Sequence, residues 1–244
     1  MTQPIKTLDE SYKTPAENLA CDEVLLNEIN TGTRGPLLRF WESHAYFVVV
    51  GYGNSIEREC DTTACERLSI PILRRISGGG AVMQGPGCLN YSLLMPIEPD
   101  NPTRAIGDTN CHIMSTIRKA IAQMLDLPVL VQGHTDLTLE GVKFSGNSQR
   151  RQRNALLFHG TFLLDFDISL IEKTLKFPSV TPTYRNGRGH VEFCRNLPVN
   201  ADKLKTVIEK AWQTKGIGLT PNRNLLTKLV RQKYANPEWV QRRK

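Results

Sequence analysis

Apolar residues recur along the first quarter of the chain with a spacing that changes from helical to strand-like. Cys21, Leu25 and Ile29 follow one another every four residues, and residues 14–17 supply a cap residue, a proline in the first turn and a glutamate. This pattern predicts a helix that begins at residue 14. Between residues 36 and 53, β-branched and aromatic residues gather in two short runs, which predicts two strands and a turn.

The remainder of the chain groups its predicted strands between helices. The apolar stripe Ile113, Ile117, Ile121 and Met124 predicts a helix over residues 108–125. The other predicted elements are a short helix at 61–68, strands at 70–75, 88–95, 128–132, 137–145 (with a turn at Glu140-Gly141) and 155–166, and helices near 201–214 and 225–234. Strands in runs are typical of an α+β fold, here a mixed or antiparallel sheet flanked by helices.

Length and cysteine usage favour a single intracellular domain. A chain of 244 residues can bury a core without a metal or a disulfide. We find no signal peptide and no apolar run near the roughly 20 residues that span a bilayer, so we expect a soluble, cytoplasmic protein without a membrane partner. The six cysteines form no CxxC pair, which favours reduced thiols and argues against zinc.

The charge balance points to an acidic partner or an anionic ligand. The net charge is +7, and basic residues cluster at 74–75, 150–153, 185–195 and 242–244. Each cluster by itself is more typical of solvated surface than of a functional site. Nucleic acid is the obvious alternative partner, but no helix-turn-helix, zinc-finger or RNP-type aromatic signature accompanies the charge, so we do not favour it.

Three segments carry candidate chemistry. Arg74 and Arg75 precede the glycines 78–80, so two guanidinium groups and a bare backbone loop are expected to meet a phosphate or carboxylate together. The loop is not a Walker motif, and a triple glycine alone is as typical of a tight turn or bulge. Lys143 stands between a predicted strand and a Gly/Ser/Asn-rich turn, and His159 lies within an apolar strand. Ordinarily a lysine such as Lys143 is a solvated surface residue, and a histidine such as His159 is a buried residue whose hydrogen bonds are satisfied.

Together and in this order, the three segments resemble the lipoate-protein ligase family, which is related to biotin ligases and octanoyltransferases. The similar stretches are residues 74–82, Asp136-Leu137 with 143–146, and 158–161. Weaker similarity extends to 18–23 and 233–239, and so covers nearly the whole catalytic domain. The resemblance implies the biotin/lipoate-ligase-like catalytic fold over residues 1–244, with C-terminal helices from about residue 200.

The resemblance also implies an activity and its residues. ATP would convert lipoate or octanoate to an acyl-adenylate, and a partner's lysine would then displace AMP. Lys143 would be the catalytic residue, holding the adenylate and stabilising the oxyanion. Mg²⁺ would accompany the phosphates, with Asp136 as a metal contact. The implied substrate- and nucleotide-binding residues are Arg75, Ser77, Gly78, Gly79, Gly80, Ala81, Asp136, Ser145, Gly146, His159, Gly160 and Thr161.

Two other functions remain open at this point. Octanoyltransferases of the family use a cysteine thioester and no ATP. Their cysteine positions correspond here to residues 134–137 and 178–182, where no cysteine stands, but Gly85-Pro86-Gly87 before Cys88 is transferase-like. A lipoyl-binding delivery protein without catalysis is a more distant alternative.

The implied partners are proteins. The acceptor would be an acidic lipoyl-domain protein, either glycine-cleavage H-like or 2-oxoacid dehydrogenase E2-like. Many ligases of the family continue into a small accessory domain, whereas this chain stops five residues after its last similar stretch. We therefore expect the accessory domain to be absent, so that the catalytic domain either stands alone or uses a separate accessory protein for activation.

Overall fold

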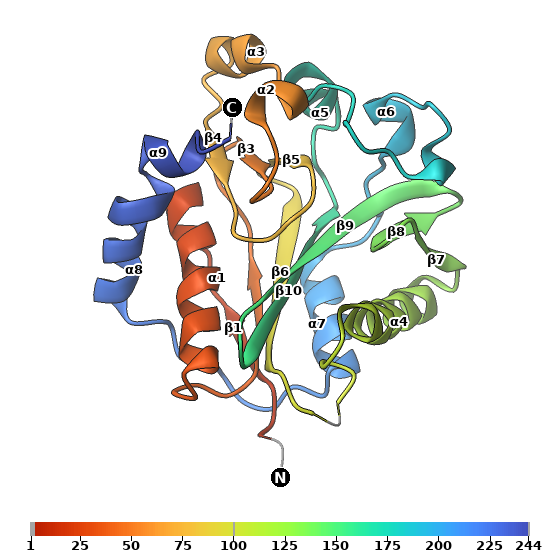
Figure 1. Cartoon of the computed structure of the whole chain (residues 1–244). Coiled ribbons are helices and arrows are strands. Elements are labelled where there is room, and N and C mark those ends of the chain that lie inside the picture. The colour runs from red at the N-terminus through yellow and green to blue at the C-terminus, as the bar shows by residue number, and fades with distance from the viewer. Residues whose placement is uncertain (1–2, 100, 244) are drawn as a thin grey trace.

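A seven-stranded mixed sheet forms the centre of the computed structural model, which describes residues 3–99 and 101–243 (Figure 1). Its strands are β1 (Lys6–Asp9), β2 (Leu37–Trp41), β6 (Cys88–Pro96), β7 (Val129–Gln132), β8 (Asp136–Leu139), β9 (Val142–Arg151) and β10 (Ala155–Leu163). They lie in the order β1-β2-β6-β10-β9-β8-β7. Only β1 and β2 run parallel, and every other neighbouring pair is antiparallel.

Helices cover both faces of this sheet (Figure 1). α1 (Pro15–Asn30) and α8 (Arg223–Leu229) lie on one face, and α4 (Ile106–Leu125) and α7 (Ala201–Ala211) lie on the other. The alternation of side chains along β10 separates the two cores, because Phe158 and Phe162 pack with the α4 face and Leu157 packs with the α1 face. Besides the helices around the small sheet described below, the chain has four further helical segments in its described part: 3₁₀ Thr183–Arg185, α6 (His190–Phe193), π-helical Val230–Tyr234 and α9 (Pro237–Val240).

A second, three-stranded sheet packs on the α1 side of the large one. It consists of β3 (Phe47–Val50), β4 (Ile72–Arg74) and β5 (Ala81–Gln84) in the order β4-β3-β5, with α2 (Ile56–Glu59), α3 (Thr62–Arg67) and α5 (Ser169–Thr174) around it. A third core joins the sheets, since Val48 and Met83 of the small sheet pack in one cluster with Cys88 and Leu163 of the large one.

The structure confirms the α+β prediction and most element positions. The predicted helix start is a capping box, in which Thr14 and Glu17 exchange side-chain-to-backbone bonds. The turn at Glu140-Gly141 is confirmed, with φ of 53° and 75°. No helix within the described residues is long and apolar enough to cross a membrane.

Two predictions on the strands were incomplete or wrong. The two strands predicted between residues 36 and 53 exist, but β2 and β3 belong to different sheets. Residues 146–150 are strand rather than turn. Although Gly, Ser and Asn have low strand propensity, β9 pairs with β10 without interruption from Ser145 to Arg151, and this tertiary pairing overrides the local preference.

Candidate active site

A cleft of about 1240 Å³ opens between the small sheet and the β8–β10 part of the large sheet. One wall consists of residues 78–84, which run from the glycine loop into β5. The opposite wall consists of residues 132–136, 143–148 and 159–161, and residues 178–185 line a third side. The three sequence segments singled out for their chemistry therefore meet around one cavity.

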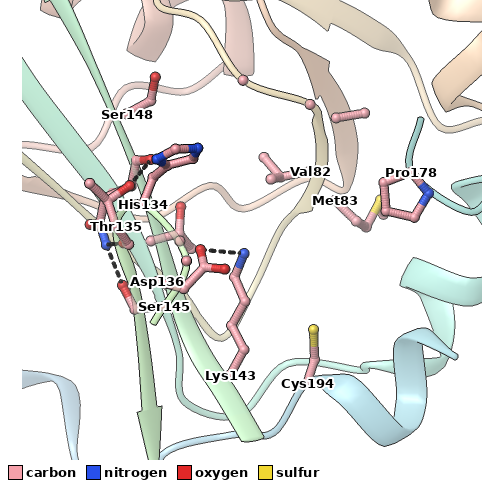
Figure 2. Close-up of a pocket in the computed structure, with 18 of the residues that line it drawn as sticks. Val82, Met83, His134, Thr135, Asp136, Lys143, Ser145, Ser148, Pro178 and Cys194 are labelled. Carbon is pink, nitrogen blue, oxygen red and sulfur yellow. Dashed lines mark hydrogen bonds and ion pairs between the residues drawn. The ribbon is translucent and has the colours of Figure 1, made fainter. Parts of the chain in front are cut away.

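Lys143 extends from β9 towards the middle of this cleft (Figure 2). Its Nζ lies 2.8 Å from Asp136 Oδ1, and the Tyr184 hydroxyl donates to Asp136 Oδ2 at 2.7 Å. Burial, followed by the neighbouring Asp136 carboxylate, raises the pKa of Tyr184, so its hydroxyl remains protonated. Gly146 makes room for the ammonium group, because a Cβ at that position would lie 2.9 Å from Nζ. The ammonium is thus oriented by a carboxylate while part of it remains open to a ligand.

Arg75 is engaged by its own chain, unlike Lys143, although the sequence predicted that it would bind an anion. It lines the cleft, but its guanidinium group is buried and donates to main-chain oxygens of Val49, Gly78 and Gly80 and to Ser77 Oγ. Burial, together with the adjacent Arg74, lowers the pKa of Arg75 to about 10. Arg75 therefore holds the shape of the glycine loop.

Arg74 is engaged in the same way. Its guanidinium group donates to the carbonyl oxygens of Gly51, Asn54, Val240 and Arg243. The guanidinium groups of Arg74 and Arg75 thus donate to main-chain carbonyls in this structure, and their expected joint contact with an anion stays a prediction. Gly78, Gly79 and Gly80 are exposed, and within the described residues no group accepts a hydrogen bond from their N–H groups. An anion can meet the loop through these amides.

His159 belongs to a buried chain of polar groups behind the loop. Its Nε2 lies 2.6 Å from Ser77 Oγ, and its Nδ1 lies 3.8 Å from Asp22 Oδ2. The Asp22 carboxylate can only accept, so the Nδ1–H tautomer of His159 faces it, and Nε2 then accepts the Ser77 hydroxyl proton while Ser77 Oγ accepts from Arg75 Nε at 3.1 Å. His159 thereby connects the cleft to the helix α1, and is more than a satisfied core histidine.

Asp22 and Arg39 anchor the far end of that chain. They form an ion pair of 2.7 Å, and Ser92 Oγ donates to Asp22 Oδ2 at 2.7 Å. Burial by itself would raise the pKa of Asp22, but Arg39 lowers it below the usual value. Sequence reasoning missed both residues. A signal for them was available in the sequence, since each is a charged residue within a largely apolar stretch: Asp22 in helix residues 19–26 and Arg39 in strand residues 37–41.

The other residues implied by the resemblance also border the cleft. Ala81 is the first residue of β5, and Ser145 accepts a bond from Asn147 Nδ2 at 3.3 Å. Gly160 must be glycine, since a Cβ there would overlap the Asn147 amide. Thr161 hydrogen-bonds with Gln84 and Asn90. Sequence reasoning missed Asn147, which binds the Thr135 carbonyl at 2.6 Å and joins the two cleft strands β8 and β9.

Both oxygen atoms of Asp136 have partners, Lys143 Nζ and the Tyr184 hydroxyl. The described residues contain no group of three or more His, Cys, Asp or Glu side chains that could hold a metal ion by themselves. Because magnesium at a nucleotide is held by one or two carboxylates together with phosphate oxygens, the contact of Asp136 to such an ion stays a prediction.

Two cysteines bear on a thioester mechanism. Cys88 is fully buried in the core between the sheets, and burial raises the pKa of its thiol far above the usual value. Cys194 lines the cleft beside Lys143, and burial also raises the pKa of its thiol although Lys143 acts in the opposite direction. Neither environment stabilises a thiolate, which is the nucleophilic form.

Across one cleft of this helix-flanked mixed sheet, a lysine faces a bare glycine loop. The family described as "Lipoyl protein ligase A/B catalytic domain" matches residues 14–213, and the chain belongs to this family. A Mycoplasma pneumoniae relative named "Probable lipoate-protein ligase A" is 30% identical over 161 residues, which are 66% of this chain and 46% of that relative. The chain thus spans about half the length of that protein.

Other relatives match over their full length. "Octanoyltransferase LipM" of Geobacillus kaustophilus is 26% identical over 95% of this chain and 96% of its own. Among solved structures, a bi-partite lipoate protein ligase from Thermoplasma acidophilum has a TM-score of 0.79 at 22% identity, covering 98% of this chain and 96% of that one. A lipoate-protein ligase A bound with ATP has a TM-score of 0.78 at 22% identity, covering 98% of both chains. The structural likenesses show that the fold is shared.

Proposed function

We propose that the protein activates lipoate or octanoate with ATP to an acyl-adenylate and transfers the acyl group to a lysine of a lipoyl-domain protein. The observation that carries the proposal is Lys143, a half-buried ammonium in the cleft opposite the glycine loop. The cysteine that lines the cleft beside it, Cys194, has a thiol whose pKa is raised by burial, which makes it a poor nucleophile. The solved ligase with bound ATP and the same fold supports the choice of nucleotide.

The geometry suits the two half-reactions. A carboxylate is a poor electrophile, and adenylation gives it a good leaving group. Residues 78–80 line the cleft and their amide groups have no acceptor within the described residues, so these amides can bind phosphate oxygens. Lys143 donates to the acyl carbonyl oxygen, where negative charge develops when the acceptor's amine attacks. Asp136 orients the lysine through the ion pair with Nζ, and Tyr184 holds Asp136 through its hydroxyl.

The acceptor is proposed to be an acidic lipoyl-domain protein, H-like or E2-like. The chain carries a net charge of +7, and the Thermoplasma acidophilum ligase was solved as part of a system with its E2 lipoyl domain. Because the encounter between opposite charges is screened by salt, raising the ionic strength should slow acyl transfer to the acceptor. Since that ligase is bi-partite, we also propose that a separate accessory protein accelerates adenylation.

Mass spectrometry of an acceptor lipoyl domain tests the main proposal. The 244-residue chain is incubated with lipoate or octanoate, with Mg-ATP added or omitted, and in parallel with an acyl-carrier-protein thioester as donor. We expect a mass gain that requires ATP. Preformed lipoyl-AMP should support transfer by the chain alone, and comparing the two half-reactions with and without the accessory protein shows whether activation depends on it.

An ATP-independent acyltransferase is the second candidate. It is favoured by the full-length match to octanoyltransferases and by Cys194, which lies in the cleft next to Lys143. Acyl transfer from the carrier-protein thioester without ATP, together with an acyl-thioester trapped on a cysteine of the chain, would select this function over the ligase.

A further inference from the structure

Two carboxylates line the cleft within the described residues, Asp136 and Glu59. The oxygen atoms of Asp136 are both engaged, by Lys143 and by Tyr184. Glu59, the last residue of α2, is only 3% exposed and is engaged on one side, where Ser179 Oγ donates to its Oε1 at 2.5 Å. Its Oε2 accepts no hydrogen bond from any described residue, but this atom remains open to water. One oxygen of a buried carboxylate is therefore available to a ligand in the cleft.

The charge of Glu59 is not balanced by a contact with a cation of the chain. No Lys, Arg or His side chain of the described residues forms an ion pair with it. Arg75 interacts with it from farther away, since burial and Arg74 lower the pKa of Arg75 and Glu59 acts in the opposite direction. The Arg75 guanidinium is nevertheless directed to main-chain oxygens. Because buried charges in proteins are ordinarily paired or coordinate a metal ion, we expect the bound ligand to supply the partner.

Glu59 lies against the glycine loop. A Cβ at Gly80 would lie 3.3 Å from Glu59 Oε2. The amides of residues 78–80 have no acceptor within the described residues, so a phosphate bound by them would place negative charge beside this carboxylate. Two anions so close together repel each other, whereas a divalent cation between them attracts both. The position of Glu59 thus favours a phosphate that arrives with a metal ion.

We propose that Glu59 Oε2 binds a divalent cation that bridges to a phosphate of the nucleotide. The inference rests on the proposed function in one respect, namely that a nucleotide phosphate binds the glycine loop. Carboxylate and phosphate oxygens are ligands that Mg²⁺ prefers, and one or two carboxylates are its usual protein ligands beside a nucleotide. The nucleotide and water supply the other ligands, so the site needs no cluster of acidic side chains. Ser179 holds Oε1 and thereby orients Oε2.

Metal-dependent nucleotide binding tests this site apart from catalysis. Isothermal titration calorimetry measures the affinity of the 244-residue chain for ATP, without an acyl substrate, in Mg²⁺ and in EDTA. Glu59→Gln removes the charge but keeps the shape of the side chain and an acceptor for Ser179 Oγ. We expect this variant to bind ATP about tenfold more weakly in Mg²⁺, and equally or more tightly in EDTA because a repulsion is removed.

The two conditions distinguish a metal contact from a hydrogen bond. A carboxylate that binds a hydroxyl or amino group of the nucleotide directly would lose the same factor in Mg²⁺ and in EDTA when it is replaced by Gln, and this result would overturn the proposal. Equal affinity of the wild type for ATP in the two conditions would overturn it as well, whatever the stability of the variant.

Electron paramagnetic resonance of Mn²⁺ gives a second measurement that needs no turnover. At saturating ATP, Glu59→Gln should bind Mn²⁺ in the protein–nucleotide complex about tenfold more weakly than the wild type. Glu57→Gln, at an exposed position of the same helix, is the matched control, and thermal unfolding verifies that both variants are folded. Equal Mn²⁺ affinity in the two variants would refute the site even if acyl transfer requires ATP. Acyl transfer that needs no ATP, with the metal dependence intact, would refute only the proposed function.

Discussion

Two cationic side chains border the same cleft and are held in opposite ways. The Arg75 guanidinium is buried and donates to three main-chain carbonyls and a serine hydroxyl of its own chain. The Lys143 ammonium has one charged partner, Asp136, and its side chain is 25% exposed. Positive charge close to a cavity is therefore a poor guide to ligand binding by itself. The informative quantity is the number of hydrogen-bond donors on the cationic side chain that have no acceptor within the protein.

This difference separates the site into a chemical part and a supporting part. Lys143, Asp136 and the amides of residues 78–80 can contact a substrate. Arg75, Ser77, His159 and Asp22 form a buried chain that fixes the loop from behind. Substitutions in the first part should lower activity with little loss of stability, and substitutions in the second part should do the reverse.

The largest expected effect is on activity, at Lys143. Lys143→Ala removes the proposed donor to the developing oxyanion, and loss of one such donor typically costs on the order of 10²–10³ in rate. The fold should be retained because the side chain is partly exposed. Single-turnover transfer from lipoyl-AMP and thermal unfolding measure the two effects, with Lys119→Ala on the exposed face of α4 as control. Wild-type turnover in Lys143→Ala would contradict the assignment.

The next effect is on stability, at Arg75. Arg75→Lys keeps the charge, but an ammonium has three donors on a flexible stem and cannot reach carbonyls on both sides of the loop. We expect a loss of about 2–3 kcal/mol in the free energy of unfolding, because buried carbonyls remain unsatisfied. Denaturant unfolding measures it. A variant with full stability and a large increase in KM for ATP would place Arg75 with the ligand-binding residues after all.

A third, smaller effect is the acid sensitivity of the supporting chain. Arg39 lowers the pKa of Asp22 in the folded protein, so the ion pair contributes stability above the unfolded-state pKa of about 4, and the contribution is lost as the pH falls below it. Stability measured between pH 7 and 3 should fall less steeply in Asp22→Asn than in the wild type. Parallel curves would show that Asp22 is not the group responsible.

Structural features that depend on neighbouring residues were predictable from the sequence. The capping box at Thr14 and the turn at Glu140-Gly141 are local, and the structure confirms both. The similarity around Lys143 and residues 78–80 identified groups that meet across sheets. The direction of a guanidinium group was not predictable in this way, because Arg75 binds Val49, a residue 26 positions away, and such contacts are set by sheet packing.

The same limit explains the missed residues. Asp22 and Arg39 are 17 positions apart and pair only because α1 packs on β6 and β10, beside β2. Trp41, Asn90 and Thr161 become neighbours through strand register, and the sequence does not specify which strands of a mixed sheet lie side by side.

The smallest expected effect distinguishes the two candidate functions. In a ligase that works through an adenylate, neither Cys88→Ser nor Cys194→Ser should abolish acyl transfer, since no thiol takes part. Cys88→Ser places a hydroxyl in a fully buried site and should cost some stability, whereas the half-buried Cys194 should tolerate serine. Transfer to the acceptor is measured with ATP and, separately, with a carrier-protein thioester. Exposed Cys111→Ser is the control for general loss of a thiol. If Cys194→Ser abolishes transfer while the protein remains folded, and an acyl-thioester forms on Cys194 in the wild type, the cleft contains a nucleophile, and Lys143 then assists a transferase.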